Sequence, residues 1–231
     1  GRTPTMRTFY CCLVVVMGVQ SLRAGEPEPT AIFDGKTLAG WRAADKNAYE
    51  KPGKVTVKDG VIVLPQGQAA TGIVYAKDNF PKTNYEVSLE ARRTEGSDFF
   101  CGMTFPVGKE YCTFICGGWG GGTTGLSNVD SFNADENETT DFVEFKNGQW
   151  YKIRLRVTDA KIEAWIDKEK KVDLDRKDKK FDIWWEQEPL RPFGIGNWHT
   201  SSELRNITLT RLDVLRREAE QRKVEQEDAT E

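Results

Sequence analysis

The sequence predicts an all-β fold, either a sandwich or a barrel. Between residues 32 and 212, turn residues separate short apolar segments, and several of these segments carry an apolar residue at every second position. This alternation is typical of a strand that buries one face. No convincing amphipathic helix precedes residue 213. We therefore expect about eleven short strands, as in many β-sandwiches and barrels.

A hairpin is predicted near the start of this region. Residues 55–57 and 61–64 are short β-forming segments, and Asp59-Gly60 lies between them. An Asp-Gly pair adopts positive φ at little cost, which favours the tight turn of a two-stranded hairpin.

The next strands show the clearest alternation. Tyr85, Val87, Leu89 and Ala91 define one face of a predicted strand, with Glu90 and Arg92 on the opposite face. Residues 151–157 and 162–166 alternate in the same way and are joined at residues 158–160. Each of these segments is expected to bury one face and to present its polar residues on the other.

Residues 117–140 do not follow this pattern. They are rich in Gly and Asn and carry few apolar residues. A loop of this length in a compact domain is usually functional or disordered. Its acidic residues include Asp130, Asp135 and Glu138. Hard oxygen ligands can hold Ca²⁺, but a solvated acidic loop is the favoured interpretation, so no metal site is predicted and a structural calcium or a catalytic divalent metal stays open.

The two ends differ from the middle of the chain. Residues 1–24 resemble a signal peptide that starts at Met6, because Arg7 precedes an apolar stretch and Ala24 offers a small residue at the cut. A buried N-terminal strand is the alternative. Residues 25–30 would form a linker, residues 31–212 the β domain, and residues 213–231 a charged tail that is a frayed helix or disordered. The protein is therefore expected to be secreted or periplasmic.

Composition excludes two classes of partner. The chain has 231 residues and a formal net charge of −3, whereas a nucleic-acid-binding domain usually carries a basic patch or stripe. No apolar run approaches the roughly 20 residues that cross a bilayer, so no membrane span is expected. The sequence predicts no oligomeric state.

Three cysteines, Cys101, Cys112 and Cys116, follow the predicted signal peptide. An odd number allows at most one disulfide within the chain. On one straight strand Cys112 and Cys116 would be too far apart to bridge. A Cys101–Cys112 pair across a hairpin and three buried free thiols are both open. Zinc is not expected, because no CxxC pair exists and the only histidine is distant in the sequence.

Several short motifs, taken in order, resemble the 3-keto-disaccharide hydrolase family. The domain opens with IFDGKTLAGW at residues 32–41, followed by VKDGVI at 57–62 and YEVSLEAR at 85–92. It continues with GQWY at 148–151 and IEAWID at 162–167. It closes with FGIGNWH at 193–199 and LRNI at 204–207. No single motif is specific; the resemblance lies in their ordered spacing over residues 32–212.

The resemblance implies a concanavalin A-like jelly-roll sandwich of two antiparallel sheets, with a ligand bound across a concave face. It also implies cleavage of a glycosidic bond in a sugar that carries a ketone at C3. Such a reaction needs a base, an acid for the leaving oxygen and a group that steadies the enolate. The Glu-x-Gln pair that the family often carries has no counterpart in residues 111–130.

Eight residues are candidates for the site. Glu90, Glu144 and His199 are predicted to be catalytic: Glu144 lies between apolar residues that could turn it inward, and His199 is the only imidazole. Predicted substrate-binding residues are Arg92, Trp119, Asn128, Asp130 and Trp198. Each has a structural alternative, such as a surface ion pair for Glu90 and Arg92. Trp184-Trp185-Glu186 is a further aromatic and carboxylate group, with core packing as its alternative.

The sequence therefore supports three hypotheses. The first is a secreted enzyme that cleaves 3-keto-glycosides by hydrolysis or by elimination and hydration. The second is a non-catalytic, lectin-like carbohydrate-binding module. The third is a structural extracellular domain without a small ligand. Carboxylates and His199 gathered in one groove would favour the enzyme, and aromatic rings alone would favour the binding module. A groove filled by its own loops would favour the structural domain.

Overall fold

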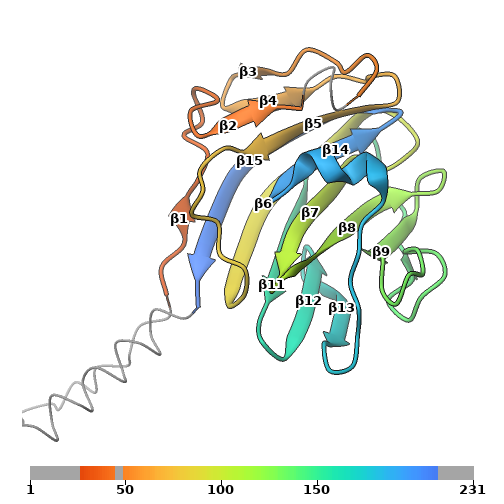
Figure 1. The fold of residues 1–231 in the computed structure, drawn as a ribbon. Coiled ribbons are helices and arrows are strands. Elements are labelled where there is room, and N and C mark those ends of the chain that lie inside the picture. Colours follow the sequence, from red (N-terminus) through yellow and green to blue (C-terminus); the bar gives the residue numbers. More distant parts are fainter. Residues whose placement is uncertain (1–26, 45–48, 213–231) are drawn as a thin grey trace, which may run out of the picture.

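The structure, a computed structural model, describes residues 27–44 and 49–212 (Figure 1). The predicted signal peptide and the predicted charged tail lie outside the described residues. Within the described ranges, no helix is long and apolar enough to cross a membrane.

Two antiparallel sheets form the molecule (Figure 1). The first sheet runs in the order β13 (Glu169–Asp175), β12 (Lys161–Ile166), β11 (Tyr151–Val157), β6 (Tyr85–Gly96), β15 (Thr200–Arg211), β4 (Val61–Leu64) and β3 (Thr56–Lys58), and β1 (Thr30–Ala31) pairs with β15. The second sheet runs in the order β10 (Asp141–Phe142), β9 (Thr123–Ser127), β8 (Glu110–Gly118), β7 (Cys101–Val107), β14 (Gly194–Trp198), β5 (Ala70–Tyr75) and β2 (Trp41–Ala43).

The core lies between the two sheets. Tyr85, Val87 and Leu89 of β6 point into it, and Phe105 of β7 and Phe114 of β8 meet them from the second sheet. All five are at most 1% exposed. The all-β prediction and the predicted jelly-roll sandwich are therefore confirmed, and the alternation in the sequence corresponds to one face in the core and one outside.

The predicted turn chemistry is also confirmed. β3 and β4 pair in register across Asp59 and Gly60, whose φ angles are 50° and 81°. Since positive φ is cheap for Gly and tolerated by Asp, these two residues set the hairpin.

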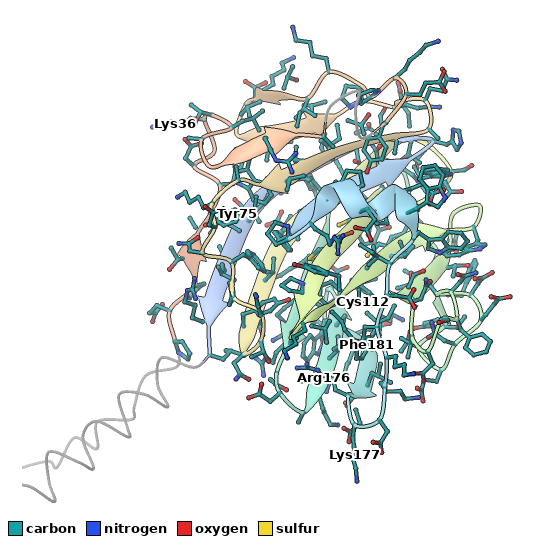
Figure 2. The ribbon with its side chains drawn as sticks, in the orientation of Figure 1. Lys36, Tyr75, Cys112, Arg176, Lys177 and Phe181 are labelled. Carbon is teal, nitrogen blue, oxygen red and sulfur yellow. The ribbon has the colours of Figure 1, made fainter. Side chains whose placement is uncertain are left out.

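The cysteine pairing across the hairpin is wrong. The turn at Gly108 and Lys109 places Val107 opposite Glu110, so the register sets Cys101 opposite Cys116 and Cys112 opposite Phe105. All three cysteines are free and buried, and Figure 2 shows Cys112 in the interior of the molecule. The alternative of three buried thiols fits the structure.

Residues 117–140 are not one long loop. They contain β9, and the turns that follow are tied together by Asn137, whose side-chain amide donates hydrogen bonds to the carbonyl oxygens of Leu126, Phe132 and Asn133 at 2.7, 3.1 and 2.6 Å. Asp130 and Glu138 both pair with Lys179. Among the described residues, no group of three or more His, Cys, Asp or Glu side chains is arranged to hold a metal ion.

One short helix was not expected from the sequence. The 3-10 helix η1 (Trp185–Leu190) lies on the outer face of the second sheet, over β5 and β14 (Figure 1). Leu190 is fully buried there. A Cβ atom on Gly72 would lie 2.7 Å from the Leu190 side chain, and one on Gly196 would lie 3.1 Å from it. The two glycines therefore let η1 sit close to the sheet.

Candidate functional site

A cavity of about 260 Å³ opens on the outer face of the second sheet. We call it the tryptophan cavity. Its lining residues come from β8, β9, β14, η1 and the segments before β7, after β8 and before η1: Asp98, Phe99, Thr113, Ile115, Trp119, Ser127, Trp184, Glu186, Gln187 and Trp198.

The floor of the tryptophan cavity follows from strand alternation. Phe114 of β8 points into the core, so Thr113 and Ile115 on either side of it point outward. Trp198 at the end of β14 stacks on Phe99, with ring centroids 6.3 Å apart and planes tilted by 20°. These residues form a floor that is largely apolar, with hydroxyl groups at Thr113 and Ser127.

One wall is the tight glycine turn that follows β8. Trp119 adopts a φ of 48° and is 45% exposed, and Gly117, Gly120 and Gly121 in the same segment also have positive φ. Asp98 supports the turn: its carboxylate accepts hydrogen bonds from the backbone N–H of Gly120 at 3.3 Å and of Phe99 at 2.7 Å. Asp98 is therefore occupied in holding the backbone that presents Trp119.

The opposite wall is η1 with the residue before it. Trp184 is 44% exposed, and Trp185 is 72% exposed. Gln187 is buried and joins a row of hydroxyl groups: its Oε1 atom accepts from Thr104 Oγ1 at 3.5 Å, and Thr104 Oγ1 lies 3.0 Å from Thr113 Oγ1. This row fixes Gln187 against β7 and β8.

Glu186 on the same wall is different. Its Oε2 atom is buried and has no hydrogen-bond partner, and the residue lines the tryptophan cavity. Within residues 27–44 and 49–212 only one other buried side-chain N or O atom lacks a partner, the phenol oxygen of Tyr49. A buried polar group without a partner is unusual and calls for an explanation, such as a catalytic role. A buried, unpaired carboxylate on a cavity wall can accept a proton from a bound molecule.

Trp119 and Trp198 both line the tryptophan cavity, so the structure brings these two predicted substrate-binding residues together. His199 lies next to them but does not line the cavity. Its side chain is exposed, and its ring meets Trp198 edge-on at 5.4 Å. The backbone N–H of His199 donates to the carbonyl oxygen of Ala69 at 2.8 Å.

Glu90 and Arg92 do not share a site with these tryptophans. They lie on the outer face of the first sheet, on the far side of the core. Glu90 accepts two hydrogen bonds from Arg205, at 2.8 and 2.6 Å, and one from Asn206 at 2.9 Å. The Asn206 hydrogen bond and the Arg205 guanidinium lower the pKa of Glu90. Arg92 pairs with Glu203 at 2.6 Å. The alternative of surface ion pairs fits both residues.

A second hollow, of about 690 Å³, lies on this outer face of the first sheet and includes Glu90. Both of its carboxylates are already paired, Glu86 with Arg154 and Arg156, and Glu90 with Arg205. None of the described residues that line it is aromatic. The tryptophan cavity, although smaller, is the better candidate because it combines aromatic rings with an unpaired carboxylate.

The expectation that Glu144 turns inward is wrong. Glu144 is exposed, and it lies between β10 and β11 in a segment without strand pairing. Phe145 is the residue that turns inward, where its ring meets Phe100 at 4.9 Å and Tyr151 at 4.9 Å. Glu144 is therefore exposed to solvent and lies outside the tryptophan cavity.

Asn128 and Asp130 also lie outside the tryptophan cavity, although their neighbour Ser127 lines it. Asn128 donates from its side-chain amide to Asp182 at 2.6 Å. Asp130 accepts from the backbone N–H of Lys180 at 2.9 Å, which lowers the pKa of its carboxyl group. Both residues fasten the turn after β9 to the segment that leads to η1, and so support the wall that carries Trp184 and Glu186.

Of the Trp184-Trp185-Glu186 group, Trp184 and Glu186 line the tryptophan cavity and Trp185 is exposed beside it, so the core-packing alternative is wrong. Thr113, Ile115 and Ser127 were missed, although they alternate with the core residues of β8 and β9. Asp98, Phe99 and Gln187 were missed as well. Nothing local in the sequence marks those three, because their positions depend on how distant segments meet.

A flat ring beside a few polar groups suits a sugar, whose ring carries apolar C–H faces and polar hydroxyls. The fold and the site thus define a carbohydrate-active β-sandwich. The chain belongs to the family of 3-keto-alpha-glucoside-1,2-lyase-like domains, whose model matches residues 28–210. No curated protein matches the chain.

Solved structures share the fold at low sequence identity. The apo form of Crh5 transglycosylase is 10% identical, with a TM-score of 0.54, and the match covers 81% of this chain and 85% of that one. Crh5 transglycosylase in complex with NAG is 11% identical, with a TM-score of 0.54 and coverage of 81% and 84%. A structure from work on endo-acting O-glycanases of the human gut microbiota is 13% identical, with a TM-score of 0.50 and coverage of 76% and 93%.

Proposed function

We propose that this domain binds a 3-keto-glycoside in the tryptophan cavity and cleaves its glycosidic bond, with Glu186 as the general base. The observation that carries the proposal is the Oε2 atom of Glu186, which is buried without a partner on the cavity wall. Family membership supports the reaction class. We further propose that the protein acts outside the cytoplasm, secreted or periplasmic.

The chemistry follows from the ketone. A carbonyl at C3 acidifies the hydrogen at C2, so Glu186 can take that proton and leave an enolate. The enolate electrons then form a C1=C2 bond and expel the aglycone oxygen, which takes up a proton. Water adds to C1 of the resulting enone and restores the keto sugar. The sum is hydrolysis. The protonated Glu186 carboxyl can return its proton to the leaving oxygen, and the hydroxyl groups of Thr113 and Ser127 can steady the enolate. We propose no cofactor. A positioned base typically accelerates such a step by about 10²–10⁴.

The remaining lining residues would bind and orient the sugar. Trp119, Trp184 and Trp198 offer ring faces, and Thr113, Ser127 and Gln187 offer hydrogen-bonding groups. Rings on two walls and the floor would hold the sugar ring so that C2–H faces Glu186. Such alignment supplies a large part of the rate in enzymes that act by positioning.

The test is release of free glucose from 3-keto-trehalose by the wild type, Glu186→Gln and Glu144→Gln. The Gln variant at 186 keeps the shape of the wall but removes the base, and we expect its rate to fall by about 10²-fold or more. Glu144→Gln is the matched control, because that carboxylate is exposed and outside the cavity. Equal rates for the wild type and Glu186→Gln would refute the role of Glu186.

A non-catalytic binding module is the second candidate. One observation favours it: four aromatic residues line the tryptophan cavity against two carboxylates, and one of these, Asp98, is already bound to backbone amides. In that case the wild type would release no glucose, and calorimetry would show saturable binding of 3-keto-trehalose that Glu186→Gln retains.

A further inference from the structure

Tyr49 lies directly behind the wall that carries Glu186. It is 7% exposed and belongs to a small apolar cluster with Val74 of β5 and Leu190 of η1. A Cβ atom on Gly196 would lie 3.8 Å from the phenol oxygen, which places that oxygen against β14 beside the tryptophan cavity. Tyr49 thus packs beneath the helix on which Glu186 sits.

The phenol oxygen of Tyr49 and Oε2 of Glu186 are the two buried side-chain atoms without a hydrogen-bond partner in the part of the chain that the structure describes. Both residues lie at η1: Tyr49 packs against Leu190 of this helix, and Glu186 is part of it. Burial is the larger cause and the charge of Glu186 the smaller cause of a raised pKa of Tyr49. Tyr49 therefore keeps its proton at neutral pH, and its hydroxyl can only usefully donate to the carboxylate.

We propose that Tyr49 is a positioning residue for Glu186: rotation of either side chain lets the Tyr49 hydroxyl donate a hydrogen bond to the Glu186 carboxylate. This bond holds one carboxylate oxygen against the wall and leaves the other free to reach the cavity. It also favours the ionised form, which is the form that accepts a proton. The proposal rests on the proposed function in so far as Glu186 is the base.

Other features do not support an inference of this kind. Both carboxylates of the second hollow, Glu86 and Glu90, already form ion pairs with arginines. Asp98 is bound by two backbone amides. Tyr49 and Glu186 differ from these features, because the Tyr49 hydroxyl is a donor without an acceptor and the Glu186 carboxylate is an acceptor without a donor.

The test compares the carboxylate carbon NMR signal of Glu186 at pH 7 in the wild type, Tyr49→Phe and Tyr111→Phe. The Glu186 signal is the one that disappears in Glu186→Gln. Removal of the donor should shift this signal in Tyr49→Phe, because the carboxylate loses its hydrogen bond. Tyr111→Phe is the matched control, because Tyr111 stacks on Arg191 at 4.9 Å and does not line the cavity.

Kinetics on 3-keto-trehalose give a second readout, in which kcat should fall about tenfold in Tyr49→Phe while KM stays unchanged, because the variant loses the positioning of the base and not substrate binding. An unchanged Glu186 signal in Tyr49→Phe would overturn the pairing, even if the wild type is active. A shifted signal in a protein that releases no glucose would keep the pairing and refute the proposed function. The two ideas therefore fail in different experiments.

Discussion

Trp119 is expected to affect binding and not stability. It sits on a turn of glycines, is 45% exposed and contributes a ring to the tryptophan cavity. Trp119→Ala should weaken binding of 3-keto-trehalose about fivefold, since a lost aromatic contact is worth about 1 kcal/mol. It should leave the melting temperature nearly unchanged.

Calorimetry and thermal unfolding check this prediction. Trp185→Ala is the control, because Trp185 is 72% exposed and is not a lining residue. Equal affinities of the two variants would show that Trp119 does not contact the sugar.

Glu90 shows the opposite case, a residue whose effect belongs to stability. Its folded-state pKa lies below the ordinary value of 4.5. The ionised carboxylate therefore stabilises the fold above about pH 4.5, and this contribution is lost as the pH falls through the lower folded-state pKa. The gain is at most about 1 kcal/mol, because solvent screens a partly exposed ion pair.

Urea unfolding of the wild type and Glu90→Gln at pH 7 and at pH 3 checks this dependence. The wild type should be more stable at pH 7, and the difference should shrink at pH 3. A difference that does not change with pH would contradict it.

The positions of the predicted site residues in the structure show what a single sequence can predict about a site. Alternation identified the outward faces of strands, and it correctly placed Glu90 and Arg92 on one. It could not tell which of two sheets carries the cavity, because both sheets have an outer face with the same period. Trp119 was found because it lies in a glycine-rich segment, and Trp198 because it neighbours the only histidine just before the last strand.

At the scale of elements, η1 forms the cavity wall and depends on two glycines. A Cβ atom on Gly72 would lie 2.7 Å from Leu190. Gly72→Ala should destabilise the protein by about 1–3 kcal/mol through overpacking. Leu190→Ala should cost about 2–5 kcal/mol, because Leu190 is fully buried.

The double variant Gly72→Ala/Leu190→Ala tests whether the two residues compete for the same space. Because alanine at 190 makes room for a methyl group at 72, the two changes together should cost less than the sum of their separate costs. Chemical unfolding of all four proteins measures this coupling. Additive costs would mean that the two side chains do not compete for the same space.

The strands and the helix differ in how far the sequence predicts them. Alternation of apolar and polar residues predicts β6, β11 and β12. The Asp59-Gly60 pair predicts the turn, because both residues tolerate positive φ. η1 has too few residues to show a helical period, and its place is set by Gly72, more than a hundred positions away in β5, and by Gly196 in β14. The Cys101 and Cys116 register depended on where a two-residue turn falls, which the sequence around Gly108 did not reveal.

At the scale of the whole molecule, the buried thiols report on unfolding. Cys101, Cys112 and Cys116 are free and fully buried, and burial raises the pKa of Cys112 and of Cys116. In the protein that begins at Gly25, which lacks Cys11 and Cys12, these three thiols should therefore react very slowly with a thiol reagent at pH 8. Unfolding in urea should expose them to it.

Reaction with Ellman's reagent, with and without urea, checks this expectation. The melting temperature should be the same with and without a reductant. Rapid native labelling of Cys112 would mean that the interior of the sandwich opens without global unfolding.

The position of the last strand has a consequence for how the protein is made. β15 lies between β6 and β4 in the first sheet, and it also pairs with β1 (Figure 1). Until the ribosome has released residues 200–211, the first sheet has a gap in its middle, and the aromatic core beneath it cannot be sealed. The first sheet can therefore be completed only after β15 has left the ribosome.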